Sequence, residues 1–152
     1  MNLNINQNDI KHFRSAYYSP VPRLLVAKQL RKYATACIDI SDGLVADALH
    51  LSQASNVNLT INIDDIPISD QSQRWLLFQS DYDEALKNFL NWGDDYELLF
   101  TSNSNNDDLF KRVSSELGLR LTKIGKVRKG EGVNVLKAKK LIRFDKTGHK
   151  HM

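Results

Sequence analysis

Two short acidic segments carry the side chains best suited to chemistry. Asp39, Ser41 and Asp42 belong to the run Asp-Ile-Ser-Asp-Gly-Leu, which we call the first acidic segment. Asp94 and Asp95 belong to the run Gly-Asp-Asp-Tyr-Glu-Leu, which we call the second acidic segment. Carboxylate oxygens suit Mg²⁺, which keeps several waters and shares phosphate oxygens with a bound nucleotide. The two segments therefore predict a site for a metal ion or for a phosphorylated ligand. Their acidic side chains are expected to cluster at one edge of a sheet.

The first acidic segment is expected at a turn between a strand and a helix. Residues 36–40 form a short apolar run that predicts a buried strand, and a helix is expected from Asp42 to about residue 54. Carboxylates at such a turn lie at the edge of a sheet where ligands bind, and the helix N-terminus attracts phosphate. A structural alternative stays open, in which Ser41 or Asp42 only caps the helix and Asp39 is an ordinary turn residue.

The second acidic segment is expected at a turn that leads into a strand over residues 96–101. Two adjacent aspartates repel each other unless a cation or a hydrogen-bond donor lies between them. Asp and Gly are also common in hairpin and loop turns that bind nothing. Glu97 is expected to be a solvent-facing residue at the start of the strand.

The rest of the pattern predicts one α+β domain, with a mixed sheet and helices packed on its faces. Helices are predicted over residues 23–33, 70–77, 83–90 and 106–117, and further strands over residues 58–63, 119–127 and 133–136. Residues 129–132 predict a tight turn between the last two strands. Pro20 and Pro22 predict extended backbone before the first helix. In the helix after the first acidic segment, Asp47 and Ser52 are expected to face outward.

Composition excludes several classes of protein. The chain has 152 residues, which fits one domain, and no segment approaches the ~20 apolar residues that cross a bilayer. Residues 120–152 carry 11 Lys or Arg against 2 Asp or Glu, but these basic residues come singly or in pairs, so nucleic-acid binding is not expected. The single cysteine, Cys37, lies in an apolar run and predicts a buried structural thiol. We therefore expect a soluble, cytoplasmic protein.

Several familiar catalytic patterns do not occur in the sequence. It has no Gly-Lys-Ser/Thr phosphate loop, which excludes a P-loop kinase. It has no Gly-x-Ser-x-Gly elbow, so serine nucleophile catalysis has no support. The histidines, including His12 and His50, show no spacing that indicates a metal site.

The two acidic segments, taken with further motifs, resemble the C-terminal half of thiamine-monophosphate kinases. The resemblance runs from about Pro20 to the end of the chain, and that family belongs to the superfamily of aminoimidazole ribonucleotide synthetase. The additional motifs, in the order of the family, are Pro22-Arg23, Ile66-Pro67, Ile124-Gly125-Lys126-Val127 and Gly148-x-x-His151. The resemblance implies the C-terminal domain fold of that superfamily.

The resemblance implies transfer of the γ-phosphoryl group of ATP to thiamine monophosphate, which gives thiamine diphosphate. Positioning and charge neutralisation by Mg²⁺ do most of the work in such reactions, so no side chain is implied as a catalytic acid, base or nucleophile. Asp39 and Asp42 would be Mg²⁺ ligands, and Ser41 would touch ATP. Asp94 or Asp95 would face thiamine monophosphate.

The chain departs from the pattern of the family at several positions, among them Ala27, where the family has a glycine, and Asn58-Leu59, where it has a small pair. The family has a pair of glycines before the adjacent acidic residues, and this chain has Trp92-Gly93. The aromatic residue that lines the thiamine site near the C-terminus of the family is His149 here. Imidazole stacks on a ligand less extensively than a larger ring does.

The resemblance also implies a domain division. Residues 1–19 are expected to be a lead-in segment and residues 20–152 the C-terminal domain, with no N-terminal nucleotide-binding domain. The chain alone is expected to be inactive and to need a separate N-terminal half of the enzyme as a partner. The face that meets this half is expected to be exposed and partly apolar. The alternatives are a non-catalytic remnant or binding module of the same fold, and another synthetase of the superfamily.

Overall fold

The strands form two sheets in the computed structural model, which describes residues 6–144. In the smaller sheet, β1 (Ala34–Asp39) pairs antiparallel with β3 (Leu98–Ser102). The larger sheet has the order β4-β2-β5-β6, in which β2 runs parallel to β5 and the other neighbours are antiparallel. Its strands are β4 (Gly125–Lys129), β2 (Val57–Asn62), β5 (Val133–Lys137) and β6 (Lys140–Ile142). The predicted α+β fold with mixed pairing is confirmed, although the strands are divided between two sheets.

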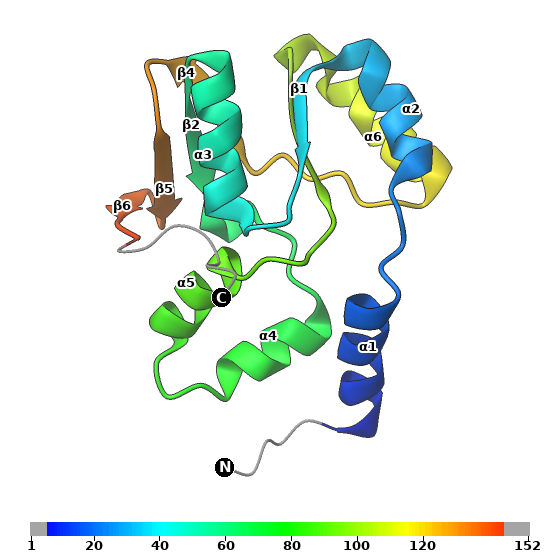
Figure 1. The fold of residues 1–152 in the computed structure, drawn as a ribbon, viewed down its shortest axis with the longest axis vertical. Coiled ribbons are helices and arrows are strands. Elements are labelled where there is room, and N and C mark those ends of the chain that lie inside the picture. The colour runs from blue at the N-terminus through cyan, green and yellow to red at the C-terminus, as the bar shows by residue number, and fades with distance from the viewer. Residues whose placement is uncertain (1–5, 145–152) are drawn as a thin grey trace.

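The helices lie between and around these sheets (Figure 1). α3 packs against both β1 and β2, and α2 lies beside α6. α4 and α5 form a separate pair below the sheets in this view. The helices are α1 (Gln7–Tyr18), α2 (Leu24–Tyr33), α3 (Leu44–Ser55), α4 (Asp70–Leu77), α5 (Tyr82–Asn91) and α6 (Asp107–Leu117), with 3₁₀ turns η1 (Ile63–Asp65) and η2 (Ser104–Asn106). None of the helices in residues 6–144 has the length and apolar character needed to cross a bilayer.

The helix α3 is the centre of the core. Its buried Ala48 and Leu51 pack against Leu59 and Ile61 of β2. At its N-terminal end, other buried apolar residues join the core of α4 and α5. These residues are Ile40, Leu44, Val45, Leu76, Leu86 and Leu90. Apolar packing on both sides therefore fixes the start of α3, where the first acidic segment lies.

The sequence did not predict α1, because this helix has few apolar residues and is held by polar contacts. Asn6 caps it by accepting a hydrogen bond from the backbone N–H of Asp9 (2.9 Å). Asp9 is buried and forms an ion pair with Arg74 of α4, and this pair lowers the pKa of the Asp9 carboxyl. The helix ends before Pro20, as expected from the proline. Tertiary contacts therefore stabilise a helix that its own hydrophobic pattern does not indicate.

The predicted tight turn does not join neighbouring strands, because β2 lies between β4 and β5. The strand predicted over residues 119–127 begins too early, since β4 starts at Gly125. Other boundaries are predicted more closely. The helix predicted over residues 70–77 matches α4, and Gly118 ends α6 in the left-handed conformation at φ 59°. Asp81 caps α5 by accepting a hydrogen bond from the backbone N–H of Glu84.

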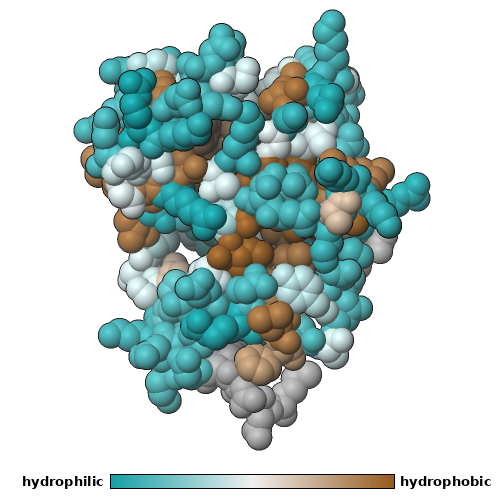
Figure 2. All heavy atoms as spheres, turned by 180° about the vertical axis from the view of Figure 1, so that it is seen from behind, coloured by the Kyte–Doolittle hydropathy of each residue, from teal (hydrophilic) through white to brown (hydrophobic). Residues whose placement is uncertain are grey.

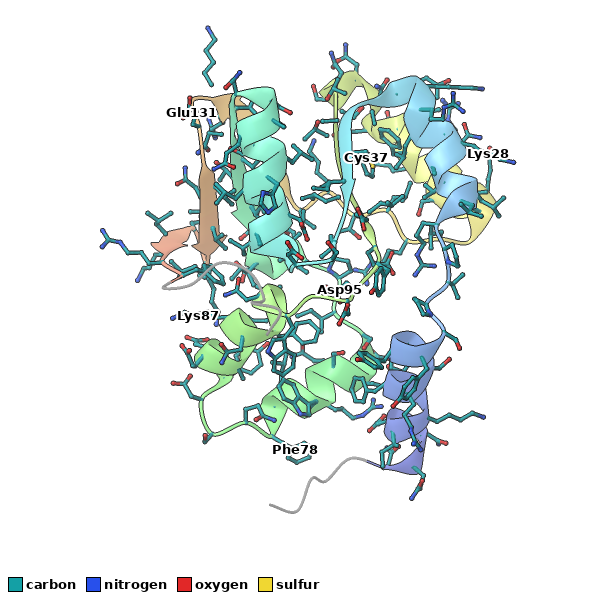
Figure 3. All side chains as sticks on the ribbon, viewed as in Figure 1. Lys28, Cys37, Phe78, Lys87, Asp95 and Glu131 are labelled. Carbon is teal, nitrogen blue, oxygen red and sulfur yellow. The ribbon has the colours of Figure 1, made fainter. Side chains whose placement is uncertain are left out.

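The prediction of a buried Cys37 is wrong: the cysteine is exposed (Figure 3). Along β1 the residues alternate between partly buried and exposed, and Cys37 lies on the open face with Thr35 and Asp39. The smaller sheet is covered on one face only, so an apolar run here does not imply burial on both faces. Partial burial, with the negative charge of Asp39, raises the pKa of the Cys37 thiol.

The prediction that Ser52 faces outward is also wrong, because this residue is fully buried. Its hydroxyl donates a hydrogen bond to the carbonyl of Val57 (2.7 Å) and accepts one from the backbone N–H of Gly132 (2.8 Å). Ser52 thus joins the end of α3 to the start of β2 and to the turn before β5. Asp47 is likewise buried, for a reason that concerns the candidate site.

Candidate functional site

The structure brings the two acidic segments side by side. The last residue pair of the smaller sheet is Asp39 with Leu98, and the antiparallel pairing continues beyond it. The backbone N–H of Ile40 donates to the carbonyl of Glu97 (2.8 Å), and that of Tyr96 donates to the carbonyl of Ile40 (2.9 Å). The backbone N–H of Asp94 donates to the carbonyl of Ser41 (2.9 Å). The predicted clustering of both segments at one edge of a sheet is therefore confirmed.

Two glycines allow this close approach. A Cβ atom at Gly93 would lie 2.0 Å from the carbonyl oxygen of Ser41, far inside van der Waals contact. A Cβ atom at Gly43 would lie 2.6 Å from the carbonyl oxygen of Asn91, and Gly43 also has a φ of 110°. Both glycines are thus required by contacts between the protein's own backbone segments.

The buried Asp47 holds the turn of the first acidic segment in place. It is 2% exposed, and its Oδ2 accepts hydrogen bonds from the backbone N–H of Ser41 (2.9 Å) and of Asp42 (3.0 Å). The N-cap of α3 is Gly43, without a side-chain hydrogen bond. Ser41 and Asp42 therefore do not cap the helix, and the predicted outward position of Asp47 is wrong. An aspartate among the apolar residues of α3 was the sequence signal for this role.

Replacing Asp47 with alanine is expected to lower the free energy of unfolding by about 2 kcal/mol, because two backbone N–H groups lose their acceptor. Urea denaturation measures this difference. The matched control is Asp47→Asn, which keeps an oxygen that can accept the same hydrogen bonds and should cost less. Equal losses for the two variants would contradict the role of Asp47 as an acceptor.

The carboxylates of the first acidic segment remain available for a ligand. Within residues 6–144 the carboxylate of Asp39 makes no hydrogen bond or ion pair, and the carboxylate of Asp42 has one long ionic contact, between its Oδ2 and Nε2 of His50 at 3.9 Å. Asp42, Asp47 and His50 place one ligand atom each within 4.8 Å of one another. Mg²⁺ prefers oxygen ligands, so the carboxylates of Asp39 and Asp42 fit it better than the imidazole of His50 does. No spacing or motif in the sequence indicated that His50 approaches this site.

The second acidic segment has an unusual backbone. Asp94 and Tyr96 both have left-handed backbone conformations, at φ 67° and 52°. The Tyr96 hydroxyl donates a hydrogen bond to Oδ1 of Asp94 (2.9 Å), and this bond raises the pKa of Tyr96. Residues other than glycine adopt this conformation at a cost that the surrounding structure must offset, and such residues cluster at functional sites.

Negative charge accumulates around Asp95, which Figure 3 shows at the junction between the sheets and the lower helices. Desolvation raises the pKa of Asp95 to about 6, and the negative charges of Glu97, Asp94 and Asp47 add to this effect. A cation near these carboxylates would relieve their mutual repulsion. The electrostatics of the site therefore favour a positively charged ligand or metal ion.

The raised pKa of Asp95 predicts a dependence of stability on pH. The folded protein binds the proton of the Asp95 carboxyl more tightly than the unfolded chain does. The contribution of this proton to the free energy of unfolding is therefore fully present below pH 3.8 and is lost as the pH rises through about 6. Because Asp95 is exposed, solvent screening makes the loss smaller than the full pKa shift implies. Urea denaturation across this pH range measures it, and Asp95→Asn should remove it. The same pH dependence in Asp95→Asn and in the wild type would contradict the assignment.

Glu97 has a different role from the one predicted. Its carboxylate forms two hydrogen bonds with the guanidinium of Arg23, one of them from Nε to Oε2 at 2.7 Å. This pairing raises the pKa of Arg23. Glu97 is therefore not simply a solvent-facing residue, because it attaches the second acidic segment to the start of α2.

Two of the departures from the family pattern, Trp92 and His149, concern the candidate site. Trp92 is 49% exposed, and its ring centroid lies 5.5 Å from that of Trp75 and 6.4 Å from that of Phe89. His149 lies outside the described residues.

A family comparison agrees with this arrangement. The family described as AIR synthase related protein, C-terminal domain, matches residues 20–137. This chain belongs to that family. The matched range contains both acidic segments and all strands except β6.

Within the AIR synthase related family, the chain is similar to thiamine-monophosphate kinases. It is 38% identical to the enzyme of Buchnera aphidicola subsp. Acyrthosiphon pisum, with 99% of this chain and 44% of that protein covered. The structure of the enzyme from Stenotrophomonas maltophilia K279a has a TM-score of 0.77 at 36% identity, covering 85% of this chain and 40% of that one. A structure of AaThiL in complex with AMPPCP and TMP has a TM-score of 0.76 at 32% identity, covering 98% of this chain and 44% of that one.

The chain spans less than half the length of the curated relatives that it matches. It corresponds to their C-terminal part. The activity of the whole proteins therefore cannot be assigned to this chain from the similarity alone.

Proposed function

We propose that this chain is the C-terminal half of a thiamine-monophosphate kinase. The reaction would transfer the γ-phosphoryl group of ATP to the phosphate of thiamine monophosphate. The observation that supports this most strongly is the continued β1–β3 pairing, which puts the two acidic segments next to each other. Two phosphorylated reactants that exchange a phosphoryl group must lie side by side, and their negative charges need cations between them.

Asp39 and Asp42 are the proposed Mg²⁺ ligands, since their carboxylates are not engaged in strong contacts within residues 6–144. Mg²⁺ would neutralise the charge that develops on the phosphates. Ser41 is the proposed contact to ATP, and Asp47 keeps the backbone of this segment in place. No residue of the chain is assigned as a general acid or base.

Asp94 and Asp95 of the second acidic segment, together with His149, are the proposed contacts to thiamine monophosphate. The structure of AaThiL with AMPPCP and TMP supports this pair of ligands, because 98% of this chain aligns with that protein. AMPPCP is a nucleotide analogue, so ATP is the proposed phosphoryl donor here.

An N-terminal half like that of the matched relatives is the proposed partner of this domain. Exposed apolar side chains between the end of α1 and the start of α2 support it, because five large ones that lie close together in the sequence are 63–72% exposed. These residues are Tyr17, Tyr18, Val21, Leu24 and Leu25. Large exposed apolar patches mark interaction sites. Figure 2 shows that hydrophobic residues also reach the surface in the middle of the back face. A protein domain that covers the N-terminal segment would lie next to Arg23 and, through its ion pair, next to Glu97.

The test is a thiamine diphosphate assay on the chain alone and on the chain mixed with a partner. The partner is the N-terminal part of the Buchnera aphidicola relative, up to the region that matches this chain. Product formation by the mixture, and not by either part alone, is the expected result. Robust activity of the chain alone would refute the need for a partner.

Calorimetry with Mg²⁺–ATP and with thiamine monophosphate completes the test. Binding of both ligands by the mixture, without product under any condition, would identify a non-catalytic binding module. Absence of binding and of product would refute the proposed function.

A further inference from the structure

An exposed aromatic surface adjoins the second acidic segment, and the proposed function gives it no role. Trp92 follows the last turn of α5 and directly precedes Gly93 and Asp94. About half of its surface is exposed, whereas Trp75 and Phe89, which its ring contacts, are partly buried and pack against the core. Trp92 is therefore the outer member of an aromatic cluster whose inner members are fixed.

The backbone on both sides of Trp92 is held firmly. Its N–H donates a hydrogen bond to the carbonyl of Asn88 (2.9 Å), which keeps it at the end of α5. The next residue, Gly93, touches the backbone of Ser41 so closely that no side chain fits between them. The indole is therefore carried on a rigid connection between α5 and the two acidic segments.

The face of an indole ring attracts cations, and it does so more strongly than the face of any other side chain. Within the described part of the chain, the one cation–π contact is between Lys137 and Tyr82, so no side chain there supplies a cation to Trp92. Asp94 and Asp95 follow within three residues and add negative charge. Desolvation, together with the charges of Glu97 and Asp94, raises the pKa of Asp95. A flat, positively charged heteroaromatic ring fits this combination of an exposed indole and carboxylates.

We propose that the indole face of Trp92 binds the thiazolium ring of thiamine monophosphate, with the adjacent carboxylates as counter-charge. This inference rests on the proposed function for the identity of the substrate, and it adds a residue that determines substrate binding. In the competing explanation Trp92 only shields Trp75 and Phe89 from water. The two explanations differ in whether an apolar side chain without an aromatic ring can replace Trp92.

The test uses tryptophan fluorescence of the full chain, which reports on this cluster alone because Trp75 and Trp92 are its two tryptophans. Thiamine and thiamine monophosphate are titrated into the wild type, Trp92→Leu and Trp92→Phe. Trp92→Leu is expected to weaken the binding of both ligands by about 2- to 30-fold, and Trp92→Phe should retain most of the affinity. The matched control is Phe78→Leu, which changes an exposed aromatic residue outside the cluster and should leave binding unchanged.

A second comparison tests the charge of the ring. The neutral 4-methyl-5-(2-hydroxyethyl)thiazole is expected to bind the wild type more weakly than thiamine does. Equal affinity of wild type and Trp92→Leu for thiamine would overturn the inference, as would equal affinity of the wild type for the neutral thiazole and for thiamine. Absence of thiamine binding by the wild type would also overturn it. Thermal unfolding of each variant shows whether a loss of binding reflects a loss of folding.

The assay with the N-terminal half separates this inference from the proposed function. If the mixture forms thiamine diphosphate and Trp92→Leu leaves the KM for thiamine monophosphate unchanged, the inference fails and the function stands. If the mixture forms no product but thiamine binding still depends on the ring at position 92, the inference stands and the kinase function fails.

Discussion

Asp42→Asn is expected to lower the rate of thiamine diphosphate formation by the reconstituted mixture by about 100- to 1000-fold. The substitution removes the negative charge of a proposed Mg²⁺ ligand while it keeps the size of the side chain. The fold should tolerate it, since the Asp42 side chain is 40% exposed and its nearest ionic contact, to the exposed His50, is 3.9 Å long. Initial rates at several Mg²⁺ concentrations measure the effect, and part of the loss should be recovered at high Mg²⁺.

Asp108→Asn is the matched control for the charge. Asp108 lies on α6, is highly exposed, and pairs with Lys111 at the surface, where such pairs contribute little. A rate close to that of the wild type is expected. A loss in Asp108→Asn comparable to that in Asp42→Asn would indicate a general effect of net charge and would remove the support for a metal site at Asp42.

The largest effect on stability is expected for Gly93→Ala, at about 3–5 kcal/mol of the free energy of unfolding. The added Cβ would lie 2.0 Å from the Ser41 carbonyl oxygen, and neither backbone segment can move without breaking the hydrogen bond between Asp94 and Ser41. Urea denaturation of the isolated chain measures the loss, and the binding of Mg²⁺–ATP should fall with it.

Gly118→Ala is the control for this substitution. Gly118 has a φ of 59°, and a Cβ there would meet no atom within 4 Å, so the cost is conformational only and about 1 kcal/mol. If Gly93→Ala costs no more than Gly118→Ala, the two acidic segments are not in close contact in solution.

The local pattern of the sequence predicted the elements that contain their own signals. α4 and α6 have hydrophobic periodicity and clear end residues, which are Ser69 at the start of α4 and Gly118 after α6. The adjacency of the acidic segments could also be predicted, because both were expected at one edge of a sheet. For helices such as α4 and α6, short-range sequence information is sufficient.

The errors come from contacts between distant parts of the chain. α1 depends on the ion pair between Asp9 and Arg74. These residues are 65 positions apart, so the sequence around each of them does not predict that they pair. Asp47 is buried because it accepts hydrogen bonds from the backbone N–H groups of Ser41 and Asp42, which have no other acceptor within residues 6–144. Cys37 is exposed because one face of the smaller sheet has no layer over it. Burial and pairing of this kind are properties of the tertiary structure.

The order of strands in the larger sheet has a consequence for synthesis of the chain on the ribosome. β2 is made early, but both of its neighbours, β4 and β5, lie more than 60 residues later in the sequence. Until the last third of the chain has emerged, both edges of β2 have unpaired backbone groups, and exposed edges of this kind promote aggregation. A nascent chain arrested near residue 120 would thus be a natural client of a chaperone, although most of its helices could already have formed.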